Sequence, residues 1–245
     1  ARPNLAAPGR GTAGGKPDLS GIWRTTNGRL LADIGAEGVE IPMRPAAQAI
    51  YRERQENNGK DRPSGRCVSH GLTDFNLLGI PTKIVQTPAV TIILFEAYNH
   101  YRQILTDGRP LPVDPQPAWL GYSIGRWEGD TLVVDVTRFN GKSWFDRAGN
   151  FHSDALHLVE RFTPITRDAI RYEVTIEDPK TFTRPWKISM PLYRRLEPTM
   201  ELLEYRCIEF VEEFLFGNLR KEQLVKRWEG ETMIVDITRK VPPGD

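Results

Sequence analysis

The chain has 245 residues, of which 33 are basic and 32 acidic, and its formal net charge is +1. Charges of both signs are mixed along the sequence, so it lacks the basic tract that binds nucleic acid or an anionic membrane surface. No apolar run approaches the ~18 residues that span a bilayer. We therefore expect neither a nucleic-acid partner nor a membrane span.

Residues 1–17 are rich in Ala, Gly, Pro and Arg and show no hydrophobic periodicity, which predicts a flexible N-terminal spacer. Such a segment is typical of what remains after a signal peptide has been removed, and the chain starts without Met. We therefore expect export to the periplasm or the extracellular space. In that setting Cys67 and Cys207 are expected to form a disulfide, with two buried thiols as the alternative. Residues 18–245 are expected to form one domain.

The first strand is expected at Trp23. A helix is predicted over residues 44–55, where Pro45 suits the first turn and good helix formers follow it. Strands dominate the rest of the chain and are separated by turns that contain Gly, Asn or Pro. They are predicted at residues 83–87, 90–96, 101–106, 119–127, 131–137, 155–162, 170–177, 186–190 and 202–208. A second helix is predicted over residues 209–222.

Residues 127–138 (WEGDTLVVDVTR) return almost unchanged as residues 228–239 (WEGETMIVDITR). Each copy is typical of a β-hairpin, in which Glu-Gly-Asp/Glu forms the turn and an alternating apolar strand follows. Trp127 and Trp228 precede the same turn. We therefore expect both indoles to serve the fold rather than a ligand.

About ten antiparallel strands joined by short turns favour closure, because an open sheet of that size leaves edges that aggregate. The predicted fold is mostly β, a closed or nearly closed antiparallel β-barrel of the lipocalin/calycin type with two short helices. Gly21-Ile-Trp23 is similar to the Gly-x-Trp start of lipocalin-like barrels. Over residues 65–210, motifs such as WLGYS (119–123), GRWEGDTLVVD (125–135) and TRPW (183–186) resemble a widespread group of exported bacterial β-barrel proteins. That resemblance implies a barrel and export, but no particular reaction.

The densest polar cluster lies between Phe139 and residue 161, and it includes Trp144, Asp146, His152 and Asp154. An imidazole beside a carboxylate is the usual basis for a general base near neutral pH. We therefore expect His152 to act as base or acid, with Asp146, or else Asp154, as its partner. The alternative is that His152 caps the turn and bonds to the backbone.

The next predicted strand places His157 and Arg161 on one face and Glu160 on the other, among apolar residues. Burial would raise the pKa of Glu160 unless a basic side chain reaches it, so Glu160 is a candidate acid. The alternative is a structural ion pair, because buried charges are normally paired. The candidate partners are Arg126, Arg161 and Arg184. Developing negative charge would be stabilised by Tyr122, Arg126 or Arg161.

A second polar connection, residues 178–186, carries Asp178 and Trp186. Together with Trp119, Tyr122, Trp127 and Trp144, it offers the flat surfaces on which sugars and aromatic rings stack. The expected substrate contacts are Trp144, Trp186, Arg126, Asp154, Asp178 and His157.

The four histidines contain no HxH or HExxH spacing, so no metal site is predicted from a motif. They are His70, His100, His152 and His157. Distant strands of a barrel can still assemble ligands, which leaves a His-ligated metalloenzyme as a third hypothesis. The sequence also lacks a P-loop, GxGxxG and GxSxG, so no cofactor and no serine-hydrolase chemistry are expected.

The leading hypothesis is an exported β-barrel enzyme, a lyase, isomerase or hydrolase, that transfers protons on a small ring-bearing substrate such as a sugar, phenolic or terpenoid. The competing hypothesis is a non-catalytic protein that binds a small molecule. A catalyst needs the histidine and the carboxylate within hydrogen-bond reach of each other and of a cavity. A carrier needs a mainly apolar cavity with isolated polar groups. The oligomeric state stays open.

Overall fold

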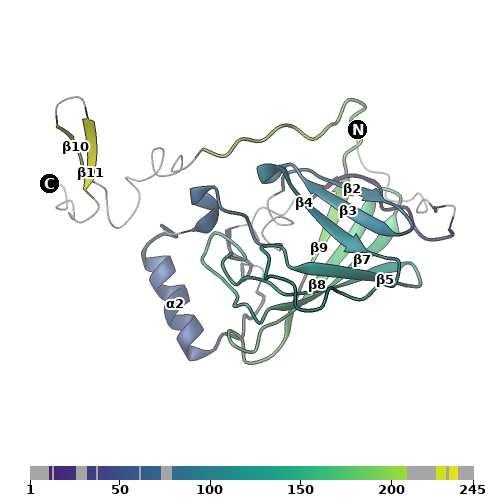
Figure 1. Cartoon of the computed structure of the whole chain (residues 1–245), viewed down its shortest axis with the longest axis horizontal. Helices are drawn as coiled ribbons and strands as arrows, with labels where there is room; N and C mark the ends of the chain where they lie inside the picture. Colours follow the sequence, from purple (N-terminus) through teal and green to yellow (C-terminus); the bar gives the residue numbers. More distant parts are fainter. Residues whose placement is uncertain are drawn as a thin grey trace.

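A closed barrel of nine strands forms the body of the protein (Figure 1). The computed structural model describes residues 11–12, 14–25, 32–36, 38–60, 62–72, 79–208, 225–229 and 232–236. The barrel strands, in chain order and in sheet order, are β1 (Gly21–Arg24), β2 (Thr82–Gln86), β3 (Val90–Phe95), β4 (His100–Leu105), β5 (Tyr122–Glu128), β6 (Thr131–Thr137), β7 (His157–Thr166), β8 (Ala169–Glu177) and β9 (Trp186–Arg194). β9 pairs with β1 and closes the sheet. The predicted mostly-β barrel is confirmed.

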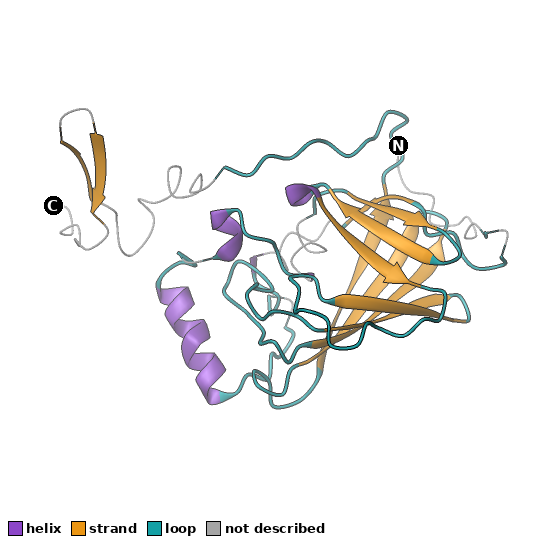
Figure 2. Cartoon of the chain, in the orientation of Figure 1, coloured by secondary structure: helices purple, strands orange, loops and turns teal. Residues whose placement is uncertain are grey.

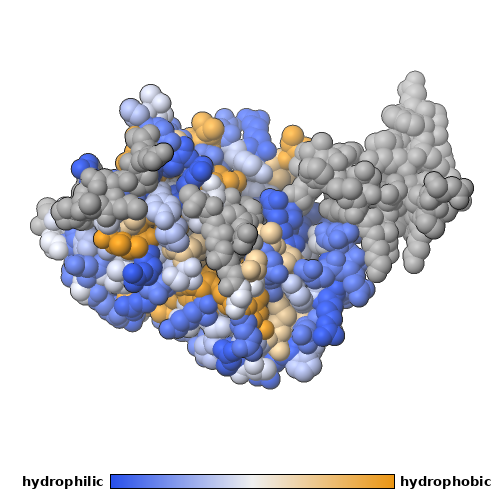
Figure 3. Space-filling model, turned by 180° about the vertical axis from the view of Figure 1, so that it is seen from behind, coloured by the Kyte–Doolittle hydropathy of each residue, from blue (hydrophilic) through white to orange (hydrophobic). Residues whose placement is uncertain are grey.

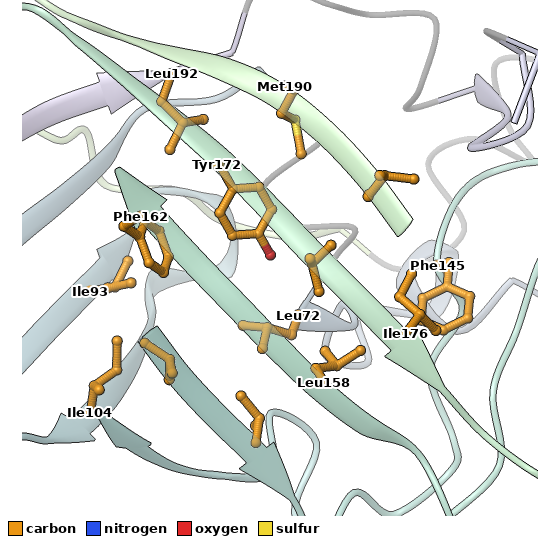
Figure 4. Close-up of a cluster of buried hydrophobic side chains, with 14 of the residues drawn as sticks. Leu72, Ile93, Ile104, Phe145, Leu158, Phe162, Tyr172, Ile176, Met190 and Leu192 are labelled. Carbon is orange, nitrogen blue, oxygen red and sulfur yellow. The ribbon is translucent and has the colours of Figure 1, made fainter. Parts of the chain in front are cut away.

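Alternation along the strands fills the barrel interior with apolar side chains. On β7, Leu158, Glu160 and Phe162 are buried, while the residues between them are partly exposed, as the period-2 pattern predicts. Figure 4 shows side chains from several strands meeting in this core, among them Phe162, Tyr172 and Met190. Burial of such side chains supplies most of the stabilising free energy of a domain.

One pair of neighbouring strands departs from the predicted antiparallel pattern. β4 and β5 run parallel and share the residue pairs Ile104↔Ser123 and Leu105↔Ile124. Residues 106–121 return the chain to the same end of the barrel, and a long connection of this kind is what a parallel pair requires. The prediction of an entirely antiparallel barrel is wrong at this seam.

Gly125 lets β4 and β5 approach each other at the seam. A Cβ atom at this position would lie 2.8 Å from Cγ2 of Ile104 and 3.2 Å from Cδ1 of Leu132. Real Cβ atoms essentially never come within 3.0 Å of a heavy atom of a residue that is not their neighbour in the chain. A larger residue would therefore displace the side chains that pack against this position, or the strands that carry them. The wall of the barrel is therefore fitted to glycine at this point.

Helix α2 (Pro45–Glu56) lies outside the barrel, against loops at one end of it (Figure 1). The guanidinium of Arg54 stacks on the ring of Trp144 at 4.2 Å and donates a hydrogen bond to the carbonyl of Gly149. The predicted second helix, residues 209–222, lies outside the described residues. Within the described part of the chain, no helix is both long and apolar enough to cross a membrane. The face in Figure 3 is mostly polar, with apolar patches between the polar residues.

Cys67 and Cys207 form the predicted disulfide. It attaches residues 202–208, predicted as a strand, to the barrel, but this segment is irregular. Its backbone bonds to side chains rather than to a neighbouring strand: Asn99 exchanges two hydrogen bonds with the backbone of Tyr205. Tyr205 also stacks on Tyr98, with ring centroids 5.1 Å apart. The strand prediction for this segment is wrong because no sheet edge is placed beside it.

The repeated sequence forms two hairpins with the same register. Trp127 pairs with Leu132 in β5–β6, and Trp228 pairs with Met233 in the two-stranded sheet of β10 (Val225–Glu229) and β11 (Thr232–Asp236). The predicted hairpins are both confirmed. Only the first belongs to the barrel, and Figure 2 shows the second as a separate sheet.

Candidate functional site

A cavity of about 480 Å³ opens where β4 and β5 separate. We call it the seam pocket. It is lined by residues 99–103 and 105, by the start of β5 with the segment before it (118–123), and by Ser69, Leu111 and Pro112. β4 and β5 share only two residue pairs, near the end of β4. The earlier part of β4 is therefore not paired with β5. The unusual parallel seam thus creates the pocket.

The pocket reaches residues that belong to both sides of the barrel wall. Arg102 and Ser123 are buried and 4% exposed each, whereas Tyr101 is 62% exposed. Successive residues of a strand face opposite sides, so Arg102 and Tyr101 stand on the inner and outer faces of β4. The pocket therefore connects the outer surface with the polar part of the barrel interior.

That polar part is a hydrogen-bonded network around one ion pair. Arg102 donates from Nε to Oγ of Ser123 (2.8 Å), from one terminal nitrogen to Oε1 of Glu160 (3.1 Å) and from the other to Oε2 of Glu160. The hydroxyl of Tyr172 also donates to Oε1 of Glu160 (2.8 Å). Glu160 and Tyr172 are 0% exposed, and Figure 4 shows Tyr172 projecting from β8 into the core. Fully bonded partners of this kind are the condition for burying two charges.

Glu160 was expected either as an acid or as one half of a structural ion pair. It is buried on the predicted face and it is paired, but its partner is Arg102 rather than Arg126, Arg161 or Arg184. Sequence reasoning missed Arg102 because residues 100–103 are all polar or aromatic, so no alternation marks the inward face. The apolar Ile104, two residues further on the same face, is the signal that was available.

Aromatic side chains form much of the rim. Trp119 and Tyr122 line the pocket, and the hydroxyl of Tyr122 donates to the carbonyl of Gln116 (3.1 Å). Gly121, between them, has φ +61 and sits where a Cβ would lie 2.6 Å from the carbonyl oxygen of Thr137, so only glycine suits this turn. Tyr122 was expected to stabilise developing negative charge, and the structure places it in the lining of the pocket.

His100 also lines the pocket. Burial lowers the pKa of His100 from its ordinary value and outweighs the opposing hydrogen bond that the imidazole donates to the Tyr98 backbone. Burial thus favours the neutral form of this imidazole in the lining.

The predicted pair of His152 and Asp146 is not brought together. Nδ1 of His152 donates to the carbonyl of Ser153 (2.8 Å), and Nε2 accepts from the hydroxyl of Ser143 (2.9 Å). Rings of Phe139 and Phe145 lie 5.6 and 5.2 Å from the imidazole. Burial lowers the pKa of His152, which favours the neutral ring. The alternative of a structural histidine bonded to the backbone fits this geometry.

Asp146 organises the loop that contains it. Its carboxylate accepts from the backbone N–H groups of Ile34 (2.7 Å), Gly149 (3.0 Å) and Asn150 (3.1 Å), and from the side-chain amide of Asn150 (2.5 Å). Burial raises the pKa of Asp146 to about 7, against the lowering effect of these donors. Both oxygens are occupied, so Asp146 does not orient His152 as predicted.

The expected substrate contacts on the two long loops have structural partners. Asp178 accepts bonds from Ser153 and from Thr181 (2.8 Å to each hydroxyl) and is 1% exposed. Trp186 packs edge-on against Phe182 at 5.3 Å, within the core. Its Nε1 donor has no hydrogen-bond partner among the described atoms. Buried Trp144 lies under Arg54 at the edge of a second, smaller cavity of about 280 Å³.

The remaining predicted residues lie on the outer surface. His157 bonds Asp135 (3.0 Å) across the outer face of the barrel, and Asp154 pairs with Lys180 (2.7 Å). Arg126 and Arg161 both pair with Glu128, at 2.9 Å each. These residues are dispersed over the outer surface, and His157 and Arg161 share an outer face as the alternation predicts.

Within the described chain, no group of three or more His, Cys, Asp or Glu side chains is arranged to hold a metal ion. Comparisons with protein-family models, with curated proteins and with solved structures give no match. The interpretation of the site therefore depends on its own geometry.

Proposed function

We propose that this protein is an exported carrier or receptor that binds a small molecule in the seam pocket. The observation that carries the proposal is a cavity of about 480 Å³ that meets the buried network at Arg102 and Ser123. Ligand sites of ~300–1,000 Å³, lined mainly by apolar and aromatic groups with a few fixed polar groups, are typical of small-molecule binding. The lining of Trp119, Leu120, Leu111, Pro112 and Ala118 has that character.

Export is supported by the disulfide between Cys67 and Cys207. Disulfides persist in the periplasm and outside the cell, whereas reducing systems keep most cytosolic thiols free. The resemblance to exported bacterial barrel proteins points in the same direction.

An enzyme that transfers protons is the second candidate. The supporting observation is that burial raises the pKa of Asp146 to about 7, a value that suits proton transfer at neutral pH. Asp146 is nevertheless 0% exposed and accepts four hydrogen bonds. A substrate would have to displace them, so we rank binding above catalysis.

The test is to block the seam pocket without changing the charge. Ala118→Phe puts a large ring into the lining, while Ala49→Phe makes the same change on the exposed face of α2. A thermal-shift screen of phenols, terpenoid alcohols and sugars on the wild type identifies ligands. We expect Ala118→Phe to abolish their stabilising effect and Ala49→Phe to retain it. Unchanged binding by a correctly folded Ala118→Phe protein would refute the proposed site.

A further inference from the structure

We infer that the seam pocket selects an uncharged, flat ring compound and discriminates against anions and cations carrying the same ring. This inference rests on the proposed binding function and adds the chemical class of the ligand. It follows from how the protein compensates the charge at the inner end of the pocket.

Among the described residues that line the pocket, Arg102 is the one whose side chain carries a full charge. Both of its terminal nitrogens bond to the carboxylate of Glu160, and its Nε bonds to Ser123. The pair is 4% and 0% exposed. The inner end of the pocket is therefore polar, but its net charge is near zero.

An anionic ligand would have to compete with Glu160 for the guanidinium. If the ligand displaced Glu160, the fully buried carboxylate of Glu160 would keep the hydroxyl of Tyr172 as its remaining partner. A buried charge without a counter-charge is strongly unfavourable. A cationic ligand would approach the guanidinium of Arg102 and would lose its hydration without gaining a counter-charge. Both charged forms are thus disfavoured for physical reasons that do not affect a neutral molecule.

The shape of the ligand follows from the rim. Trp119, Tyr122 and Tyr101 supply aromatic surface on which a planar ring packs. Leu111 and Pro112 add apolar contacts from the connection between β4 and β5. Neutral hydrogen-bonding groups, such as the hydroxyl of Ser69, suit one or two polar substituents on the ring.

The direct test uses three probes with one ring system: 2-naphthol, 2-naphthoate and 2-naphthylmethylammonium. Calorimetric titration of the full chain at pH 7 gives their dissociation constants, and Ala118→Phe verifies that binding occurs in the seam pocket. We expect 2-naphthol to bind at least about tenfold more tightly than either ion. Tightest binding by 2-naphthoate would overturn this inference and leave the proposed function standing. Absence of binding by all three would count against both.

A variant shows whether the ion pair causes the selectivity. Glu160→Gln leaves Arg102 with an uncompensated charge, so we expect the preference to change to 2-naphthoate. Glu173→Gln, on the outer face of β8, removes the same charge outside the barrel and should leave the preference unchanged. Retained preference for 2-naphthol in a folded Glu160→Gln protein would refute the role of the pair.

Should Glu160→Gln fail to fold, the double variant Arg102→Met/Glu160→Met tests whether the guanidinium of Arg102 is available to anions in the wild type, because it removes both charges together. The ratio of the affinities for 2-naphthol and 2-naphthoate should then stay within about threefold of the wild-type ratio. A selective loss of 2-naphthoate binding in the double variant would show that Arg102 is available to anions, and the inference would be wrong.

Discussion

Removing Arg102 alone should harm the barrel more than removing both members of its ion pair. Arg102→Met leaves the carboxylate of Glu160, which is 0% exposed, with a single donor from Tyr172. Truncating one partner of a buried pair typically costs about 3–5 kcal/mol. We therefore expect the free energy of unfolding of Arg102→Met to fall by about that amount, as measured by urea denaturation at pH 7.

The double variant Arg102→Met/Glu160→Met provides the comparison. Replacing a whole buried pair by apolar side chains of similar volume is often neutral or stabilising. We expect its stability within about 1 kcal/mol of the wild type, which gives a coupling energy of about 3 kcal/mol or more in a double-mutant cycle.

The exposed pair of Arg126 and Glu128 on β5 is the matched control. Their side chains are 59% and 41% exposed, and surface pairs contribute about 0–1 kcal/mol. Arg126→Met should therefore have an effect below about 1 kcal/mol. An equally small effect of Arg102→Met would mean that Glu160 is hydrated or protonated once Arg102 is lost, and the account of the network would fail.

Burial raises the pKa of Asp146 from 3.8 to about 7, so its contribution to stability is present below pH 4 and is lost as the pH rises to 7. Relative to Asp146→Asn, the wild-type free energy of unfolding should decline over that range by up to about 4 kcal/mol; a rising difference would contradict the direction of the shift. His152→Ala removes two buried hydrogen bonds and the packing between two phenyl rings, so we expect a loss of about 2–4 kcal/mol in chemical denaturation. Wild-type stability of this variant would mean that His152 is not structural. Reducing the disulfide between Cys67 and Cys207, which closes a loop with a sequence separation of 140, should lower stability by up to about 5 kcal/mol in the chain-entropy model. The melting temperature with and without dithiothreitol measures this, and equal values would show that the bond does not constrain the unfolded chain.

Local patterns predicted most of the strands, because alternation and turn residues act within a few positions. The inward direction of Glu160 followed from its apolar neighbours Leu158 and Phe162. The parallel seam could not be predicted in the same way. It depends on where residues 106–121 return the chain, and their turn residues are also compatible with a hairpin connection.

The candidate site was harder to predict than the fold. His152 and Asp146 are close in sequence and chemically suited to each other, but backbone groups and Ser143 occupy their polar atoms. Arg102 and Glu160 are 58 positions apart, and no local pattern links two residues at that distance. Proximity in sequence thus favoured the wrong pair.

The glycine at the seam also bears on how copies of this chain can assemble. A protein that contains two nearly identical hairpins could in principle assemble by domain swapping. In such an assembly, the β10–β11 hairpin of one molecule would take the place of the β5–β6 hairpin in the barrel of the next. Lys226 of β10 is equivalent to Gly125 of β5. Gly125 pairs with Val134 of β6, and Lys226 pairs with Val235 of β11, the corresponding residue of the repeat. A side chain there would collide with Ile104. The barrel wall is therefore fitted to the β5–β6 hairpin and disfavours its near-copy at the same position.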